Sequence, residues 1–184
     1  LNGIARWDGA RWQSLGGGLQ STGWLELRVR NLTEYGGQLV LAGQFDHATQ
    51  GTALHYNGTK WLAVTDAGLG TGQINSVWAT SSDFVYICGV GGLLARYDGL
   101  AWNLINGGTT VNLHSIWGTP GGLASSVVFA AGDNGSIFRI RYAVDTQWAK
   151  LQTTGTINTL FGIYGDGSQV VYAVGSGGAV VRAD

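Results

Sequence analysis

The feature that most constrains the fold of this chain is an internal repeat of about 43 residues. Its first part is a short apolar strand, an Asp-Gly or Asn-Gly turn, and a Trp three residues after the Gly. Clear copies occupy residues 4–12, 53–61 and 94–102, a stretched copy occupies residues 137–148, and a shortened copy ends the chain at residues 180–184. The basic position of the strand returns at intervals of 49, 41, 43 and 43 residues, as Arg6, His55, Arg96, Arg139 and Arg182. A period of this length is typical of stacked structural units.

A second part of the repeat alternates with the first and supplies two more strands to each unit. Its opening segment has matching copies at residues 74–78, 113–117 and 157–161, with a weaker copy at residues 29–33. Each copy precedes an apolar segment that ends in glycine, at Gly43, Gly89, Gly132 and Gly175. The unit therefore holds four short segments that are rich in β-branched and aromatic residues and are bounded by turn residues, which predicts strands.

Four strands in about 43 residues are typical of a β-propeller blade. The sequence predicts an all-β fold of about four antiparallel four-stranded blades, in a single domain that spans residues 1–184. The 32 glycines suit tight turns and close backbone approaches, and the charged content of 11% suits sheets whose faces are both covered. A β-solenoid or a β-sandwich is the rival architecture, but a sandwich does not need near-identical units and a solenoid coil is usually shorter.

The strand copies are unequal in number. The Arg-bearing strand occurs five times, at both ends of the chain, whereas the Trp-bearing and Gly-ended strands occur four times each. A closed ring of four blades does not need the fifth copy. We therefore expect a segment of a larger propeller, or an open array that is completed by other chains. Unpaired strand edges invite pairing, so the expected partners are other protein chains or copies of this chain.

Charge and motif content exclude several classes of function. A net charge of −1 without a basic run argues against nucleic acid and anionic membrane surfaces as partners, and no apolar run is long enough for a transmembrane helix. The single cysteine, Cys88, lies in an apolar strand and is expected to be buried and unreactive. The histidines His47, His55 and His114 fit no metal motif, and the Gly-rich stretches lack the Lys of a P-loop. We expect no metal and no cofactor.

The acidic residues give no sign of catalysis. Most of the 11 acidic side chains adjoin Gly, Ser, Thr or Asn, which is typical of turns. A glycosidase needs two converging carboxylates with separated pKa values, and no such pair stands out. The chain is therefore predicted to have no catalytic residues and not to be an enzyme.

An Arg and an Asp recur two positions apart, and this spacing places both side chains on one face of a strand. The three copies are Arg6 with Asp8, Arg96 with Asp98, and Arg182 with Asp184. One interpretation is structural, with the Arg bonded to backbone, paired with the turn carboxylate or stacked on a Trp. The other is a ligand site repeated in every blade, as in multivalent lectins.

The repeats resemble those of bacterial secreted proteins built from tandem IARWDGxxWxxLGxG and VxSVWGTSxxDVYAVGxGGxIxRYDG units. Residues 4–19 and 29–45 carry the first type, residues 74–102 carry the second, and residues 113–139 and 157–182 carry the second more loosely. The resemblance covers nearly the whole chain, with His55 in place of the Arg of the repeat and Ala183 in place of its aromatic residue. It implies an extracellular or cell-surface β-propeller with an adhesive, scaffold or carbohydrate-binding role.

On a repeated scaffold, segments that occur only once are the candidates for a function specific to this chain. Unrepeated segments occupy residues 20–24, 44–51 and 119–126. The candidate ligand-binding residues are Trp24, whose indole can stack on a sugar ring, and Asp46 and His47, which can bond sugar hydroxyls. The alternative is that these side chains only pack their own loops.

Together these patterns favour a non-enzymatic extracellular module that displays loops from stacked sheets. Its predicted role is structural or protein-binding, on a cell surface or in a secreted assembly. The alternative is a multivalent carbohydrate-binding lectin, in which repetition turns weak single affinities into avidity.

Overall fold

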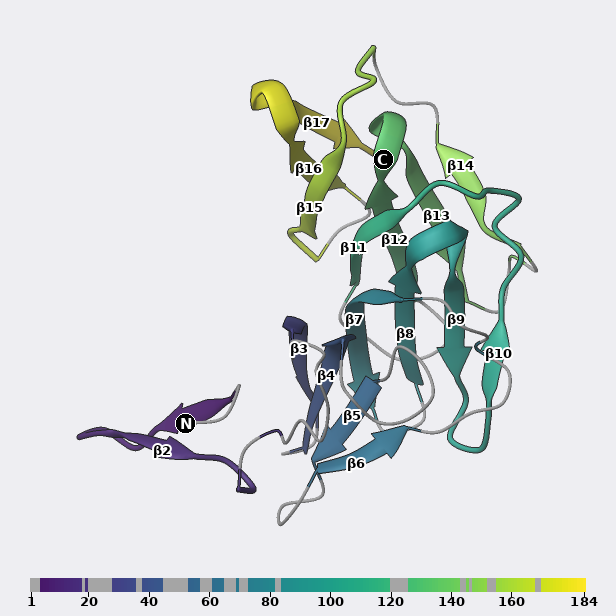
Figure 1. The fold of residues 1–184 in the computed structure, drawn as a ribbon. Coiled ribbons are helices and arrows are strands. Elements are labelled where there is room, and N and C mark those ends of the chain that lie inside the picture. Colours follow the sequence, from purple (N-terminus) through teal and green to yellow (C-terminus); the bar gives the residue numbers. More distant parts are fainter. Residues whose placement is uncertain are drawn as a thin grey trace.

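The chain folds into β-strands and short turns in the computed structural model, which describes residues 4–17, 19, 28–35, 38–44, 53–56, 61–64, 69, 73–81, 84–119, 126–142, 145, 147–151, 155–167 and 170–184. These described residues form an N-terminal hairpin and four further antiparallel sheets (Figure 1), which we number 1 to 4 in chain order. Sheets 1 to 3 have four strands each and sheet 4 has three. The prediction of an all-β fold with four-stranded antiparallel units is confirmed.

Each sheet is a meander in which consecutive strands pair with one another. The hairpin consists of β1 (Ala5–Trp7) and β2 (Trp12–Ser14), and sheet 1 of β3 (Arg28–Tyr35), β4 (Gln38–Gln44), β5 (Ala53–Tyr56) and β6 (Trp61–Val64). Sheet 2 consists of β7 (Ile74–Ser81), β8 (Phe84–Gly89), β9 (Leu94–Tyr97) and β10 (Trp102–Leu104). Sheet 3 consists of β11 (Leu113–Gly118), β12 (Val127–Gly132), β13 (Ile137–Arg141) and β14 (Ala149–Leu151). Sheet 4 consists of β15 (Leu160–Gly165), β16 (Val171–Gly175) and β17 (Val180–Ala183).

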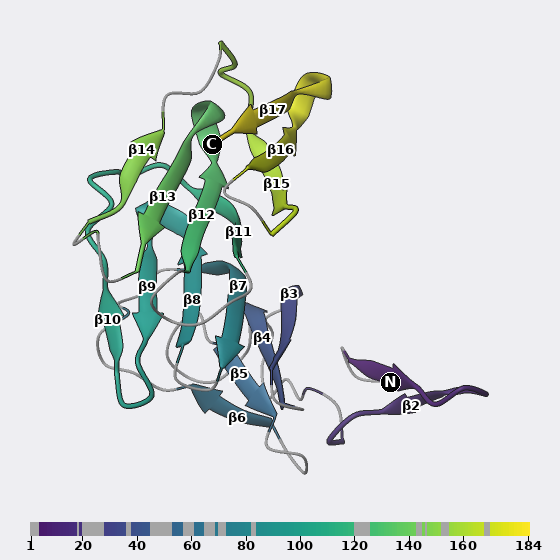
Figure 2. The same cartoon turned by 180° about the vertical axis from the view of Figure 1, so that it is seen from behind.

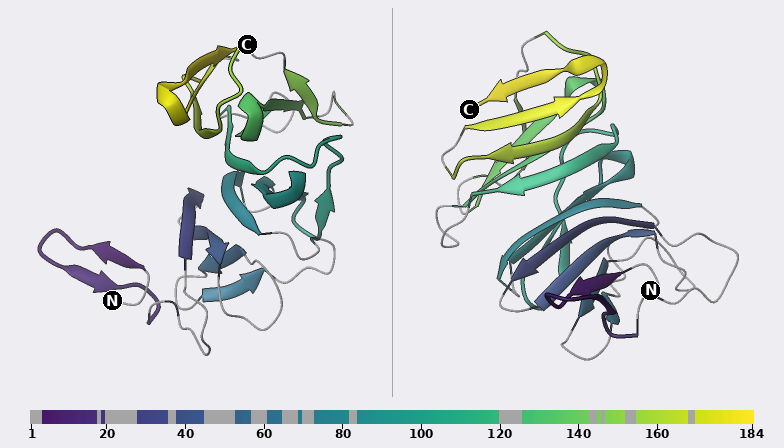
Figure 3. Two further views of the ribbon diagram at one scale, coloured as in Figure 1. Left: turned by 45° about the horizontal axis from the view of Figure 1, so that its top comes forward. Right: turned by 90° about the vertical axis from the view of Figure 1, so that its left-hand side faces the viewer.

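The four sheets follow one another along a curved stack, with the first strand of each on the inner side (Figure 3, left). We call these first strands, β3, β7, β11 and β15, the inner strands. Each inner strand contacts the inner strand of the next sheet. Seen from behind, the hairpin β1–β2 lies beyond sheet 1 at one end of the stack, and sheet 4 lies at the other end (Figure 2).

Three apolar layers between neighbouring sheets form the core. In the layer between sheets 2 and 3, Phe84, Tyr86 and Leu94 pack with Ile116 and Phe138. The strands β8 and β12 are buried from end to end, because sheets lie against both of their faces. Full burial of one such side chain contributes about 1.5–3 kcal/mol. This two-sided burial accounts for the low charge and the high aromatic content of the chain.

Every inner strand shares one irregularity where it pairs with the next strand of its sheet. The register shifts between Val29/Asn31, Ile74/Ser76, Leu113/Ser115 and Leu160/Gly162. A bulge of this kind re-aims the side chain of the extra residue. In β7 that residue is Asn75, which is buried and donates from Nδ2 to the carbonyl oxygen of Leu113 in sheet 3, at 2.7 Å.

This shared register corrects one match between the repeats. Sequence similarity aligns residues 157–161 with residues 74–78 and 113–117. In the structure β15 begins at Leu160, which pairs with Gly175 as Leu113 pairs with Gly132. The aromatic position of the repeat is therefore Tyr164, three residues later than the alignment places it. Ile157, which precedes the strand, has the apolar character of the residue that starts the repeat, and this misleads the alignment. The register of the strand is set by its pairing with the Gly-ended strand.

Hydroxyl groups join neighbouring inner strands. The Oγ of Ser76 accepts a hydrogen bond from the backbone N–H of Ile116 at 3.2 Å, and the Oγ of Ser115 accepts one from Ile163 at 3.2 Å. The two serines hold the same register position in β7 and β11. Gly162 holds this position in β15, so sheet 4 has no hydroxyl to offer at the corresponding place.

Glycine ends the second strand of sheets 2, 3 and 4 because two stretches of backbone meet there. A Cβ at Gly89, Gly132 or Gly175 would overlap the backbone carbonyl of Gln73, Asn112 or Thr159, respectively. A clash with backbone cannot be relieved by a change of rotamer. The expectation that close backbone approach explains part of the glycine content is therefore confirmed at these positions.

We predict that Gly132→Ala lowers the free energy of unfolding by about 3 kcal/mol or more, because the new methyl group overlaps the Asn112 carbonyl. Gly91→Ala is the matched control, since its Cβ would meet no atom within 4 Å. Its cost comes from the backbone alone, because a φ of 68° is unfavourable for alanine. We expect the control to lose about 1–2 kcal/mol. Urea unfolding measures both losses, and equal losses would contradict the explanation.

Candidate functional site

The predicted ligand-binding residues Trp24, Asp46 and His47 lie outside the described residues. Their proposed contact with a sugar stays a prediction. The other candidates from the sequence, namely the Arg and Asp pairs, His114 and Cys88, can be placed.

The Asp of the repeat holds the hairpin turn. The Oδ1 of Asp98 accepts hydrogen bonds from the backbone N–H groups of Leu100 and Ala101 at 3.0 and 2.9 Å, and Asp8 does the same in the N-terminal hairpin. These backbone bonds are the main cause of a lowered pKa for Asp8 and for Asp98. The intervening Gly99 has a φ of 94°. The predicted tight turn is confirmed, and its carboxylate is occupied by the turn itself.

The Arg of the repeat has varied surroundings. The guanidinium of Arg96 lies over the ring of Tyr142, which directly follows β13 of the next sheet, 5.0 Å from the ring centre, so its aromatic partner is a Tyr rather than a Trp. Arg182 and Asp184 approach to 3.9 Å at an exposed position. These contacts support the structural interpretation of the Arg and Asp pattern.

His114 is the bulged residue of β11, and it links sheet 3 to sheet 4. Its Nε2 lies 2.7 Å from Oδ1 of Asp133, and the Thr159 hydroxyl donates to the same carboxylate oxygen at 3.2 Å. The hydrogen bond from His114 is the main reason that the pKa of Asp133 is lowered. The ring of Phe161 packs on His114 at 5.4 Å. The arrangement is a link between sheets, and the described part of the chain holds no group of three or more metal-binding side chains.

Cys88 is fully buried in the layer between sheets 2 and 3. Burial raises the pKa of its thiol, which disfavours the reactive thiolate. The same layer raises the pKa of Tyr86 to about 12. Cys88 therefore serves as a small apolar side chain, as the sequence predicts.

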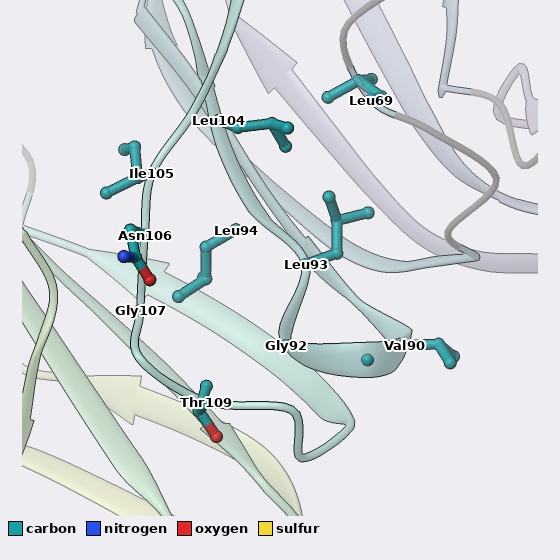
Figure 4. A pocket seen from close by; sticks show the side chains of 11 residues that line it. Leu69, Val90, Gly92, Leu93, Leu94, Leu104, Ile105, Asn106, Gly107 and Thr109 are labelled. Atoms are coloured by element: carbon teal, nitrogen blue, oxygen red, sulfur yellow. The ribbon is translucent and has the colours of Figure 1, made fainter.

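An apolar hollow of about 460 Å³ lies where β8 turns into β9 (Figure 4). Leu69, Leu93, Leu94 and Leu104 form its walls. Its lining contains no charged side chain, and the Asn106 side chain is bonded to the backbone N–H of Gly108.

A second hollow of about 280 Å³ crosses sheets 2, 3 and 4 at the opposite ends of their inner strands. Its aromatic lining is Trp78, Trp117 and Tyr164, which hold the same position in three consecutive inner strands. We call these three residues the aromatic row. The rings of Trp117 and Tyr164 are 5.7 Å apart, and Asp166 supplies a carboxylate nearby. Trp117 is 9% exposed whereas Tyr164 is 72% exposed.

Tyr164 belongs to a larger exposed surface on sheet 4. Arg182 pairs with Tyr172 and lies on the same side of this sheet. We call the surface consisting of Tyr164, Tyr172, Val174 and Val180 the terminal face. The last three are 50%, 51% and 72% exposed. The residues in equivalent positions are at most 1% exposed: Phe129, Ala131 and Ile137 in sheet 3, and Tyr86, Cys88 and Leu94 in sheet 2. The terminal face therefore has the composition of a covered sheet surface without a cover among the described residues.

Sequence reasoning missed the terminal face, although it anticipated unpaired strand edges. The sequence pattern that bears on this surface is that every position of β16 before its final Gly175 is apolar. The pattern therefore does not show which side of the strand faces solvent. The apolar and aromatic hollows were also missed, because each combines residues from distant segments.

Comparison with known proteins supports the fold. No family model matches the chain, and no curated protein matches it. The structure is similar to that of YCF48 from Cyanidioschyzon merolae, a β-propeller protein, with a TM-score of 0.64 and 13% sequence identity over 95% of this chain and 60% of that chain. The chain thus spans about 60% of the length of its structural neighbour. The described sheets have a propeller-like arrangement.

Among the residues that the structure describes, no helix has the length and apolar character needed to cross a bilayer.

We predict that Asp133→Asn lowers the free energy of unfolding at pH 7 by about 0.5–1 kcal/mol, an amount reduced by partial solvent exposure. The lowered pKa of Asp133 stabilises the fold above the usual carboxyl pKa, and this contribution disappears as the pH falls through the folded-state value. The difference between wild type and variant should therefore shrink below about pH 4. Thermal unfolding at several pH values measures it, with the exposed Asp184→Asn as a control; a difference that persists undiminished in acid would contradict the link.

Proposed function

We propose that this chain is a non-enzymatic structural and protein-interaction module of the propeller type, acting outside the cell or at a cell surface. The observation that carries the proposal is the terminal face, where large apolar side chains stay exposed at positions that neighbouring sheets bury. Contiguous apolar patches of this kind mark interaction sites. The similarity to a β-propeller protein supports a scaffold of stacked sheets, and the resemblance to secreted repeats supports the location.

The strand edge beside the terminal face can also take part in binding. β17 pairs with β16, and no described strand pairs with its other edge, whereas β9 and β13 have β10 and β14 there. A partner that adds a strand to β17 would satisfy its backbone groups. The N-terminal hairpin offers a second exposed surface, with Trp7 and Trp12 in ring contact at 5.7 Å. Another protein, or a copy of this chain, can supply the strand that pairs with β17.

The roles of the described carboxylates support a non-enzymatic module. Asp8 and Asp98 hold turns, and Asp133 accepts hydrogen bonds from His114 in its own sheet and from Thr159, directly before β15 of the next sheet. Asp145 forms two hydrogen bonds with the guanidinium of Arg141, at 2.8 and 3.1 Å, and this pair lowers its pKa. Among these four carboxylates none is paired with a second acid, as hydrolysis of a glycoside would require.

A photo-crosslinking amino acid in place of Tyr172 tests the proposal. We expect ultraviolet irradiation of the full chain, mixed with surface and extracellular proteins of the source cells, to give covalent protein adducts that mass spectrometry can identify. The same amino acid in place of the exposed Lys150 is the matched control and should give few adducts. Equal labelling at both positions, or adducts formed only with intracellular proteins, would count against the proposal.

As a second candidate we propose multivalent carbohydrate binding, which the aromatic hollow favours. Tyr164 offers an exposed ring beside the carboxylate of Asp166, a combination suited to a sugar face and its hydroxyls. The candidate residues Trp24, Asp46 and His47 would form a separate sugar site.

For this candidate, we expect the chain, displayed at high valency on a glycan array, to lose binding on Tyr164→Ala and to keep it on Tyr172→Ala. Loss of binding on Trp24→Ala alone would instead assign the sugar site to the loop that carries Trp24. If the wild type at high valency binds no glycan on the array, carbohydrate binding is ruled out as the function.

A further inference from the structure

Two asparagines that precede a glycine lie among the described residues, Asn106 before Gly107 and Asn134 before Gly135. The other Asn-Gly pairs lie outside the described residues, at residues 2–3 and 57–58. An Asn-Gly pair is prone to deamidation, because the backbone nitrogen of glycine can reach the side-chain amide carbon of the asparagine without hindrance from a Cβ. Both described asparagines are exposed. They differ in the state of the glycine nitrogen and of the amide that it would attack.

The backbone around Asn106 favours this attack. Its Oδ1 accepts a hydrogen bond from the backbone N–H of Gly108 at 2.9 Å, which holds the side-chain amide beside the peptide of Gly107. Within the part of the chain that the structure describes, the N–H of Gly107 takes part in no hydrogen bond. Attack on Cγ turns Oδ1 into an oxyanion, and the N–H of Gly108 is already bonded to that oxygen. A donor is thus in place for the charge that develops.

The backbone around Asn134 opposes the same attack. The N–H of Gly135 donates to the carbonyl oxygen of Asn158 at 2.9 Å, and Gly135 is buried. The close fit extends to Thr156, whose carbonyl oxygen would lie 2.1 Å from a Cβ at Gly135. Before its nitrogen could attack, Gly135 would have to break this hydrogen bond and leave its contact with the segment that precedes β15. The same two-residue sequence is therefore protected here and unprotected after β10.

We infer that Asn106 is a modification site, which converts to aspartate and isoaspartate by intramolecular deamidation while Asn134 keeps its amide. The nitrogen of Gly107 forms a bond to Cγ of Asn106, the bond from Cγ to Nδ2 breaks, and Nδ2 leaves as ammonia with the proton of the attacking N–H. Water then opens the resulting succinimide ring. Cleavage between the ring nitrogen and Cγ gives aspartate, and cleavage between the ring nitrogen and the main-chain carbonyl carbon gives isoaspartate. No oxidant or reductant is needed, and the assignment does not rest on the proposed interaction function.

Either product changes the apolar hollow of Figure 4, because Asn106 lies on its lining. Both products place a carboxylate where the lining has no charged side chain. Isoaspartate also adds one carbon to a stretch of main chain that is anchored on both sides. On one side the N–H of Ile105 donates to the carbonyl oxygen of Leu94 at 2.9 Å. On the other side the carbonyl of Thr109 lies against Gly92. The modification therefore changes both the charge and the shape of the hollow.

Peptide mapping of the full chain tests the inference within a single peptide. Trypsin cleaves after Arg96 and Arg139 and not between them, so both asparagines lie in the fragment of residues 97–139. After incubation in mildly alkaline buffer, we expect tandem mass spectrometry to show deamidation about tenfold or more faster at Asn106 than at Asn134, because the amide of Gly135 must first open. Unfolding the chain in urea is the control and should bring the two rates together. Equal rates in the folded chain, faster deamidation of Asn134, or an undiminished difference in urea would overturn the inference.

Gly107→Ala tests the role of the attacking nitrogen. The new Cβ would approach only side-chain atoms, Cδ1 of Leu94 at 3.1 Å and Cγ2 of Thr109 at 3.5 Å, so we expect the fold to be retained. The rate at Asn106 should fall by about tenfold or more, because the methyl group hinders the attack, and the rate at Asn134 should not change. An unchanged rate at Asn106 would mean that water hydrolyses the amide directly, and would contradict the assigned mechanism.

Amide hydrogen exchange separates the change of shape from the change of charge. Asn106→Asp supplies the carboxylate without the extra main-chain carbon. We expect the isoaspartate form, purified by chromatography, to exchange the amide of Ile105 several-fold faster than Asn106→Asp does, because the longer main chain strains the bond to Leu94. Equal exchange in the two forms would overturn the expected change of shape.

Discussion

Close approach of backbone at the inner strands is the constraint on which the rest of this structure depends. The sheets can stack there only where the facing side chain is small or missing, and Gly118 and Gly165 provide this beneath the two tryptophan rings. Large side chains are also buried away from the inner strands, at Trp102 in β10 and at Trp148 directly before β14.

Two-sided burial restricts where polar groups can lie. Several carboxylates lie in turns, where Asp98 holds a hairpin and Asp133 accepts from His114 and Thr159. The polar links between sheets are few and specific: the amide of Asn75 reaches a backbone carbonyl of the next sheet, and the guanidinium of Arg96 lies over an aromatic ring. Stability in such an array is shared between neighbours, so a sheet with one neighbour is held less firmly than a sheet with two.

Much of the fold could be predicted from the sequence because its signals are local. The Asp-Gly turn, the Gly-ended strand and the buried Cys88 each follow from a few adjacent residues, and all three were confirmed. The alignment of residues 157–161 failed because strand pairing, which is not local, sets the register of β15. The terminal face was not predictable, since apolar residues on both sides of β16 do not reveal which side lacks a neighbour. Trp24, Asp46 and His47 lie outside the described residues.

The terminal face combines large apolar side chains with groups that water solvates well. Tyr164 stands where the covered sheets carry tryptophan, and its hydroxyl can stay hydrated while the ring contacts a partner. Arg182 pairs with Tyr172 and so lies on the same side of the sheet, where its approach to Asp184 places two charges beside the apolar side chains.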